Sequence, residues 1–429
     1  MAETPLPETG ALPGDLVSLR IPGEHLMYGT WFGVPQLDFY DANTPLLPFG
    51  INEQEREALR ELTRAGVFNQ MCSETEPMAL EDIARRILEE ETTFDLSKYH
   101  IVASTEGARH AIQGILAELV TPKKPFVFYA SPNWIFDTIV GPVPGVESVD
   151  IFARTPDELI GKFEQAPESV LNRGASLIIV DPANPLGYRY SREHIERLEA
   201  HAGKYGITPI FDDVFRGLQE QGARHASSEY SHNSIIVEST SKRFGPRSLG
   251  ATWSLIPNGL TIDPKITLAC DGCTSKAART VQALHALGYE NRMRDVIAAS
   301  AEAFKQGYQR VDADNQYGDF FHAFSGMPIM TFHFKQQVDF EAKQMISATL
   351  GMTLGIQWIS HSEEKAQRAS QGTYPKPLLD VELFHGTGYM RICPTKETPE
   401  RAYYTGMVLA KVLQAASEQK NNPARTDTL

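Results

Sequence analysis

The sequence predicts an α/β protein whose larger part is a mostly parallel sheet flanked by helices. Two observations support this prediction. Between Tyr99 and Ile256, short apolar runs rich in β-branched residues alternate with amphipathic stretches of helical periodicity. Unusual polar residues follow the carboxyl ends of these runs, and that edge is where open α/β sheets bind ligands. We therefore expect a ligand site along one edge of the sheet.

The strands and helices of this region are expected between clear turn signals. The strands are predicted at residues 100–104, 125–130, 148–153, 176–181, 208–213, 234–239 and 251–256. Helices are predicted at residues 108–120 and 193–206, and before the first strand at 52–66 and 78–91. The helix at 52 has a capping-box signature, because Glu55 follows Asn52 by three residues. The alternation predicts βαβ units, which place helices on both faces of the sheet.

The remainder of the chain predicts a smaller α+β domain. Helices are expected at 277–286, 292–309 and 400–419, and strands at 329–334 and 388–392. We therefore expect an N-terminal arm at 1–50, a large domain at 51–290, a small C-terminal domain at 291–419 and a disordered tail at 420–429.

Composition excludes several classes of protein. Of 429 residues, 42% are hydrophobic and 22% are charged, and the formal net charge is −14, with no basic patch of the kind that binds nucleic acid. No apolar run is long enough to cross a bilayer, so no membrane partner and a cytoplasmic location are expected. The lone pair Cys270 and Cys273 is interpreted as two reduced thiols, because half a ligand set does not make a zinc site. No metal is expected.

Lys242 is the first candidate for chemistry. It follows the apolar run 235–237 and the hydroxyl residues Ser239, Thr240 and Ser241. Lysine forms Schiff bases when partial burial keeps some of its amine neutral, and hydroxyl groups suit a phosphate. A solvated loop lysine is the alternative. A second Thr-Ser-Lys string at 274–276 follows no strand, and we interpret it as unrelated to the site.

Other strand ends also carry candidates. The turn 104–108 contains Glu106 and Gly107 and opens into a helix, whose free N–H groups bind phosphate. Trp134 suits stacking on an aromatic ligand, and Asn184 lies in a loop made rigid by two prolines. Asp212 ends a buried strand, where its charge needs a cationic partner or several hydrogen bonds. Taken singly, each also has a plain structural interpretation as a turn, a core residue or a helix cap.

The order of these motifs over residues 43–391 resembles the fold type I pyridoxal phosphate (PLP) enzymes, and most closely the class I/II aminotransferases. The resemblance implies that Lys242 holds PLP as a Schiff base and that Asp212 pairs with the ring nitrogen. It implies that Arg391 binds the substrate α-carboxylate. It assigns the remaining cofactor contacts to Glu106, Gly107, Ala108, Trp134, Asn184, Phe215, Ser239, Ser241 and Arg247.

Two positions depart from the family pattern. Phe215 stands where the family usually has a tyrosine, and Gly250 stands where it usually has a phosphate-binding arginine. Arg247 is the expected substitute for that arginine, and Arg243 is a weaker one.

The resemblance implies a PLP-dependent enzyme acting on an α-amino acid or related amine, with transamination as the leading reaction and a homodimer as the expected assembly. The alternative is a specialised biosynthetic PLP enzyme, namely a β/γ-lyase, a replacement enzyme, a cyclase or an oxidase. A ligand sensor of the same fold is disfavoured because no DNA-binding segment is recognised. An NAD enzyme is disfavoured because no G-x-G-x-x-G follows the first strand.

Overall fold

The computed structural model describes residues 79–91, 95–131, 136–184, 186–218, 231, 233–244, 250–262, 271–286, 288–321, 330–335, 357–359, 389–392 and 399–421. The expected N-terminal arm, the helix at 52–66, Trp134, Arg247 and the tail from 422 lie outside these residues.

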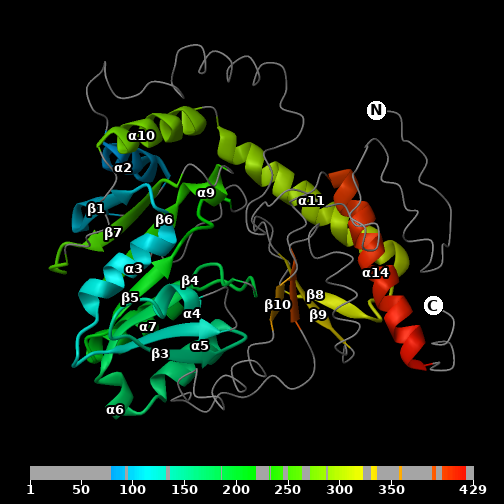
Figure 1. Cartoon of the computed structure of the whole chain (residues 1–429), viewed down its shortest axis with the longest axis horizontal. Coiled ribbons are helices and arrows are strands. Elements are labelled where there is room, and N and C mark those ends of the chain that lie inside the picture. The colour runs from blue at the N-terminus through cyan, green and yellow to red at the C-terminus, as the bar shows by residue number, and fades with distance from the viewer. Residues whose placement is uncertain are drawn as a thin grey trace.

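A seven-stranded sheet forms the larger part of the molecule (Figure 1). Its strands are β1 (Tyr99–Ser104), β2 (Phe126–Ser131), β3 (Glu147–Phe152), β4 (Gly174–Val180), β5 (Thr208–Asp212), β6 (Ile235–Ser239) and β7 (Thr252–Pro257). Their spatial order is β1-β7-β6-β5-β4-β2-β3. Strand β7 is antiparallel to both of its neighbours, and the other adjacent pairs are parallel. The predicted mostly parallel sheet is confirmed.

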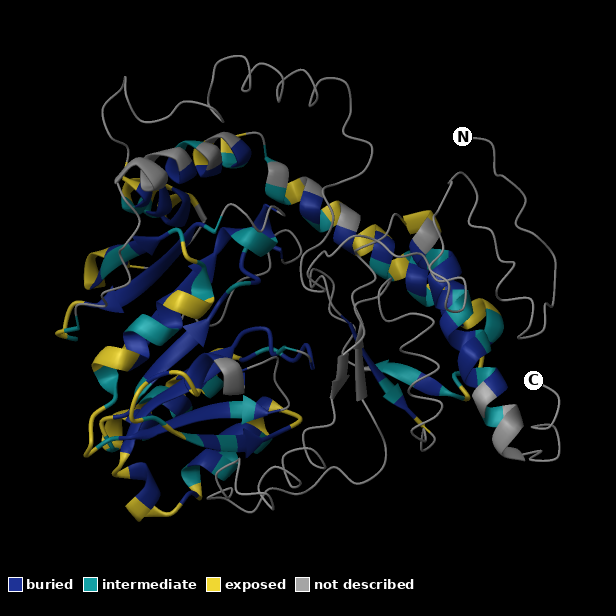
Figure 2. Cartoon of the chain, in the orientation of Figure 1, coloured by how far each residue is buried: buried dark blue, intermediate teal, exposed yellow. Residues whose placement is uncertain are grey.

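The central strands are buried along their whole length. Every residue of β4, β6 and β7 is buried, which explains why their sequences are nearly continuous apolar runs (Figure 2). Helix α3 (Ala108–Leu119) packs against β4, β6 and β7, α7 (Arg192–Lys204) packs against β5, and α2 (Leu80–Glu91) packs against β1. Shorter helical segments complete this part, namely η2 (Leu96–Lys98), α4 (Phe136–Val140), α5 (Pro156–Glu164) and α6 (Glu168–Leu171).

A second, antiparallel sheet lies in the C-terminal part of the chain. Its strands are β8 (Gly318–Phe321), β9 (Met330–Phe334), β10 (Gln357–Ile359) and β11 (Tyr389–Ile392), in the order β10-β11-β9-β8. Two long helices, α11 (Tyr289–Val311) and α14 (Pro399–Asn421), run alongside each other next to this sheet (Figure 1). The rings of Tyr308 and Phe332 meet edge to face there, with centroids 5.2 Å apart.

Helix α11 belongs to both hydrophobic cores. Met293 and Ile297 pack into the core of the seven-stranded sheet, whereas Phe304 and Tyr308 pack into the core beside the second sheet. It follows α10 (Asp271–Ala286), which packs on α2. The domain boundary expected at residue 290 stays a prediction, since the change from one core to the other falls within α11.

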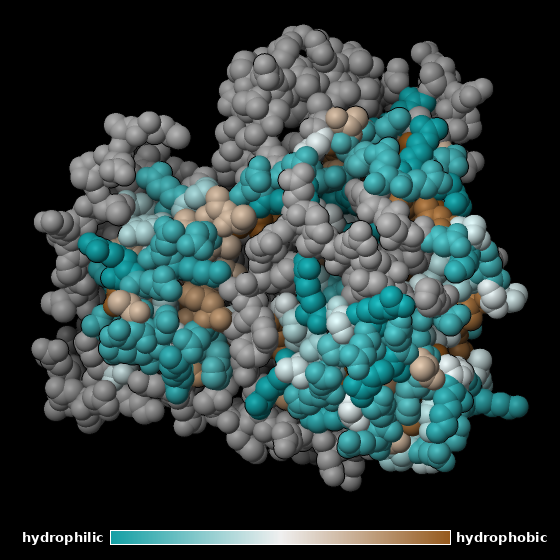
Figure 3. Space-filling view, turned by 180° about the vertical axis from the view of Figure 1, so that it is seen from behind, coloured by the Kyte–Doolittle hydropathy of each residue, from teal (hydrophilic) through white to brown (hydrophobic). Residues whose placement is uncertain are grey.

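The face seen from behind is mainly hydrophilic where residues are described (Figure 3). Among the described helices, none combines the length and apolar character needed to cross a bilayer.

Two glycines allow α11 and α14 to touch backbone to backbone. A Cβ atom at Gly307 of α11 would overlap the carbonyl oxygen of Tyr403, and one at Gly406 of α14 would overlap the carbonyl oxygen of Phe304. Each glycine therefore faces the backbone of the other helix. Any side chain at either position would force the helices apart, which would disturb the packing of Phe304 and Tyr308.

We therefore expect Gly307→Ala and Gly406→Ala each to lower the free energy of unfolding by roughly 1–3 kcal/mol, measured by urea denaturation, because an added methyl group has no space. Gly161→Ala is the matched control, since a Cβ atom at this position of α5 meets no atom within 4 Å. This control is expected to gain about 0.5–1 kcal/mol from the better helix propensity of alanine. A gain at Gly307 like that at Gly161 would contradict the close approach.

Candidate active site

The sheet register gathers polar residues at one edge. Ser104, the last residue of β1, and Ser239, the last residue of β6, both lie opposite Thr252 of the intervening strand β7. One strand further along, β5 ends at Asp212, which lies opposite Val180, the last residue of β4. The carboxyl ends of these parallel strands therefore meet, as the sequence predicts.

A cavity of about 410 Å³ opens at this edge. This volume lies within the usual range of small-molecule sites, roughly 300–1,000 Å³. The predicted site residues that line it are Glu106, Gly107, Ala108, Asn184, Asp212, Phe215, Ser239, Ser241 and Lys242. Residues distant in the chain are thus brought together around one space.

Three predicted site residues are not placed at this cavity. Trp134 and Arg247 lie outside the described residues. Arg391 lies in β11, a central strand of the four-stranded sheet, opposite Thr331 and Gln357, and its side chain is outside the described part. The roles expected for these three residues stay predictions.

Lys242 lies on a one-turn helix, α9 (Thr240–Arg243), and is partly buried. The backbone N–H and the hydroxyl of Thr240 both donate to the carbonyl oxygen of Ala251, each at 2.9 Å. These bonds attach the start of α9 to the residue before β7. The lysine therefore projects from a fixed helical turn and not from the solvated loop that the alternative interpretation expected.

The hydroxyl groups before Lys242 face each other. Ser239 Oγ and Ser241 Oγ lie 3.1 Å apart, and the N–H of Ser241 is 3.4 Å from Ser239 Oγ. Both residues line the cavity, so two hydroxyl groups are available to an anion next to the lysine.

Asp212 is buried with one carboxylate oxygen unsatisfied. Burial raises the pKa of Asp212 to about 7, although a hydrogen bond from the backbone N–H of Val214 and the charge of Lys242 both lower it. Its Oδ1 atom has no hydrogen-bond partner among the described residues. A buried acceptor of this kind is costly, and a ligand that donates a proton to it would remove the cost.

Asn184 is held by a packed loop. The N–H of Ala183 donates to the carbonyl oxygen of Tyr188 at 2.8 Å, and the buried rings of Tyr188 and Tyr190 meet edge to face with centroids 5.7 Å apart. The Oδ1 atom of Asn184 is buried and has no partner within the described part of the chain. Asn184 thus offers a second unsatisfied acceptor on the cavity wall.

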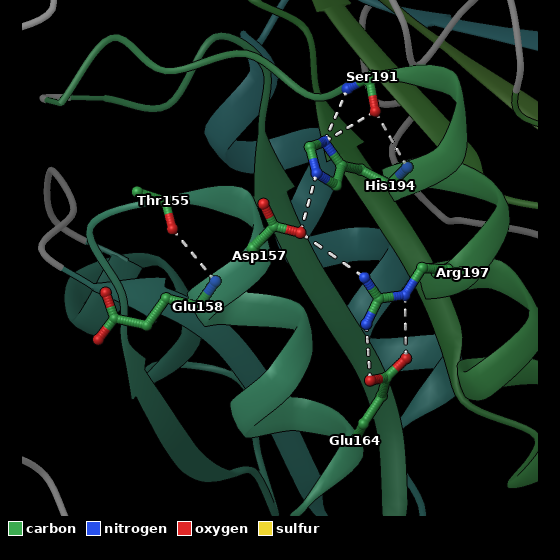
Figure 4. Close-up of polar contacts among 7 residues, drawn as sticks. All are labelled: Thr155, Asp157, Glu158, Glu164, Ser191, His194 and Arg197. Atoms are coloured by element: carbon green, nitrogen blue, oxygen red, sulfur yellow. Dashed lines mark hydrogen bonds and ion pairs between the residues drawn. The ribbon is translucent and has the colours of Figure 1, made fainter.

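The helix that follows this loop is anchored on the surface (Figure 4). The Ser191 hydroxyl accepts from the N–H of His194 and caps α7. Asp157 of α5 contacts both His194, at 3.3 Å, and Arg197, at 3.6 Å. Because Asp157 is largely exposed, these ion pairs add little stability. They connect the first two turns of α7, which follow the loop, to α5.

The turn before α3 has the form of an anion site. Gly107 is the N-cap residue at φ 83°, and it supplies no side-chain cap to the first N–H groups of α3. The N–H of Glu106 already donates to Ser104 Oγ at 3.0 Å, so Gly107 and Ala108 are the better placed donors. The exposed Glu106 carboxylate would itself repel an anion.

Gly250 closes the other side of this turn. It has φ 59°, and a Cβ atom there would overlap the carbonyl oxygen of Thr105. The position at which the family resemblance expects an arginine therefore has no space for any side chain.

A satisfied buried carboxylate supports the site from within the sheet. Glu238 of β6 accepts from Arg216 Nη1 at 2.6 Å and from Trp253 Nε1 at 2.9 Å, so both of its oxygens are paired. Arg216 lies in the turn that follows Asp212, and the N–H of Asp213 donates to Val237 at 2.8 Å. The segment carrying Asp212 and Phe215 is thereby tied to β6.

Sequence reasoning missed several lining residues. The cavity is also lined by Thr105, Arg109 and Val214. Each is adjacent in sequence to a predicted site residue, and this adjacency is the signal that could have found it. Phe136 and Ile139 line it from α4, a helix too short to show periodicity. Within the described residues, no group of three or more His, Cys, Asp or Glu side chains is arranged to hold a metal ion.

Residues 43–253 match the family model for aminotransferase class I and II. An asparagine–oxo-acid transaminase of Streptococcus mutans is 25% identical over 172 residues, which are 38% of this chain and 43% of that protein. The chain thus matches less than half of the length of its curated relatives.

Solved structures match a larger share of the chain. The N-succinyldiaminopimelate aminotransferase of Mycobacterium tuberculosis has a TM-score of 0.59 and 17% identity, covering 83% of this chain and 89% of its own. A PLP-bound protein of Clostridium difficile 630 has a TM-score of 0.58 and 14% identity, covering 89% of this chain and 92% of its own. These likenesses show a common fold.

Asp212 gives a pH-dependent prediction for the protein without ligand. Between about pH 4 and pH 7 the unfolded chain ionises this carboxyl while the folded chain keeps it protonated, because its folded pKa is raised to about 7. As the pH rises through this window, the free energy of unfolding of the wild type should therefore fall by up to about 4 kcal/mol relative to that of Asp212→Asn. Urea unfolding of both proteins at pH 4 to 8 measures the difference. A difference that stays constant with pH would contradict the raised pKa.

Proposed function

We propose that the chain is a PLP-dependent aminotransferase acting on an α-amino acid or related amine, because residues 43–253 match the family model for aminotransferase class I and II. The observation that carries this proposal is the cavity in which Lys242, Asp212 and Asn184 meet. Lysine is the residue type that attaches PLP, and the two acceptors beside it lack partners in the described part of the chain.

The residues present fit this cofactor. The unsatisfied Oδ1 of Asp212 matches a protonated ring nitrogen, which would supply the missing donor and keep the carboxylate ionised. The unsatisfied Oδ1 of Asn184 matches a ring hydroxyl. The phosphate would lie against the N–H groups of Gly107 and Ala108 and the hydroxyls of Ser239 and Ser241.

Each group of the chain then has a task in the reaction. PLP, when bound, supplies an electron sink for the pair released from the substrate Cα–H bond. Lys242 Nζ would hold the cofactor covalently, and once released it would accept the proton of the substrate Cα–H bond and later donate this proton to the bound intermediate. The buried residues Phe136, Ile139 and Phe215 exclude water from one side of the cavity. Arg391 is proposed to bind the substrate α-carboxylate with its planar guanidinium.

The absorbance spectrum tests the cofactor and its anchor. We expect the purified wild type, supplied with PLP, to show a yellow band that Lys242→Ala lacks, because the variant has no amine to form the covalent bond. Lys276→Ala is the matched control and should keep the band, since Lys276 lies on α10 and not on the helical turn that follows β6. A wild type without the band would overturn the proposal.

Transamination is tested by half-reactions. An amino-acid donor given without a keto acid should bleach the band and yield one keto acid per site, after which an added keto acid should restore the band. Aspartate and asparagine are the first donors to try, because the curated relatives are named for them. Arg391→Ala should lower kcat/KM for the donor by roughly 10²-fold, in line with loss of a charge-assisted bidentate contact. An unchanged value would remove Arg391 from the proposal.

A second reaction class is favoured by two wall positions. Phe215 lines the cavity without a hydroxyl group, and Gly250 excludes a side chain where the family usually has an arginine. Both changes alter the surroundings of the cofactor and suit a specialised lyase, replacement enzyme, cyclase or oxidase. Repeated release of ammonia or peroxide from the donor, with no keto acid acceptor and with the band retained, would favour this class.

The homodimer and the cytoplasmic location expected from the sequence also belong to this proposal. Light scattering of the purified protein at several concentrations tests the dimer.

A further inference from the structure

Four charged or titratable side chains form a line of contacts that begins at Arg243, the residue after Lys242. Arg243 Nε donates to Glu290 Oε1 at 2.8 Å, His285 Nδ1 lies 2.8 Å from the same oxygen, and His285 Nε2 lies 3.0 Å from Glu90 Oε2. These residues come from α9, α11, α10 and α2 respectively. The line therefore joins the helical turn of Lys242 to three helices outside the sheet.

The Arg243–Glu290 contact is the buried part of this line. The side chain of Arg243 is 2% exposed and that of Glu290 is 12% exposed, whereas Glu90 at the outer end is 67% exposed. Removing the Glu290 carboxylate takes a charged partner from a buried guanidinium, which is destabilising and favours movement of Arg243 or entry of water. Because Arg243 is adjacent to Lys242 in a helix of one turn, such a movement reaches the lysine directly.

Arg243 also packs on the segment that carries Asp212 and Phe215. Gly217 lies at the end of that segment with φ 83°, and a Cβ atom there would lie 3.0 Å from Arg243 Nε. The guanidinium thus occupies the space that a side chain at residue 217 would need. Arg243 thus belongs to α9, which bears Lys242, and its side chain also packs against the turn that follows Asp212.

Helix α9 is held at both ends. Thr240 fixes its start through two bonds to the carbonyl oxygen of Ala251, and Arg243 fixes its end through Glu290. Lys242 lies between these two anchors. A helix of a single turn has too few internal hydrogen bonds to set its own direction, so the outside contacts decide where the lysine points.

We propose that Arg243 and Glu290 are positioning residues for Lys242. Their ion pair holds α9 against the first turn of α11 and so sets the direction of the lysine amine in the cavity. This inference rests on the proposed function for its effect on catalysis, but the geometry it describes exists without cofactor. Helix α11 continues into the second hydrophobic core, so the anchor of Lys242 lies on the helix that is shared with the second sheet (Figure 1).

The test compares Glu290→Gln and Arg243→Gln with two reference variants in the full chain. Arg243→Lys keeps the charge and is the conservative variant. Tyr308→Phe is the matched control, because it removes a buried polar contact, the 2.7 Å bond to Asp312, in the other core. Urea unfolding of all four variants measures their loss of stability.

The first readout is the rate at which an amine-reactive reagent labels Lys242 in the protein without cofactor, followed by mass spectrometry. We expect Glu290→Gln and Arg243→Gln to change this rate several-fold, Arg243→Lys to restore most of it, and Tyr308→Phe to leave it unchanged. Labelling of Lys124, whose Nζ donates to the carbonyl oxygens of Tyr205 and Gly206, serves as the internal standard. Unchanged labelling of Lys242 in both Gln variants would overturn the proposal. Should Glu290→Gln fail to fold, Glu290→Asp, which keeps the charge but shortens the reach, takes its place.

The second readout uses the protein with PLP. The Gln variants should shift the pH midpoint of the visible band and lower kcat roughly 10- to 100-fold with little change in KM, as expected when a reacting group is misplaced by less than 1 Å. Loss of stability with an unchanged midpoint and unchanged kcat would leave the pair a purely structural contact. Absence of any band in wild type would instead overturn the proposed function, while the labelling result would still decide the role of Arg243 and Glu290.

Discussion

The burial of one carboxylate at the end of β5 is the constraint on which the site depends. Asp212 can be ionised there only beside a positive charge or a proton donor, since burial raises its pKa to about 7. The chain supplies part of that charge through Lys242 and one backbone hydrogen bond through Val214, and it leaves Oδ1 without a partner among the described residues. Asp212 therefore offers a buried acceptor to a group that can donate a hydrogen bond from within the cavity.

A second buried carboxylate near Asp212 is fully paired. Glu238 lies on the neighbouring strand and is 2% exposed, against 9% for Asp212, and Arg216 and Trp253 satisfy both of its oxygens. The fold can thus pair a buried carboxylate fully where the role is structural. Glu238 holds the turn after β5, whereas Asp212 lines the cavity with one oxygen unpaired among the described residues.

The positions of the strand-end residues could be predicted from the sequence because each signal is local. Ser239, Lys242 and Asp212 directly end or follow apolar runs, and the edge of a parallel sheet brings such ends together. Contacts between distant segments leave no such signal. Arg243 and Glu290 are 47 residues apart, and nothing in either neighbourhood indicates that they meet. The space excluded by Thr105 at Gly250 is likewise visible only once two loops have been placed.

Helix α11 explains how two hydrophobic cores can act on one site. Its C-terminal part packs closely on α14 at Gly307 and Gly406, where the absence of side chains brings the two backbones into contact. Its first turn places Glu290 on Arg243, next to Lys242. The same helix therefore contacts the segment that bears Lys242 and packs into the core beside the second sheet, in which β11 carries Arg391.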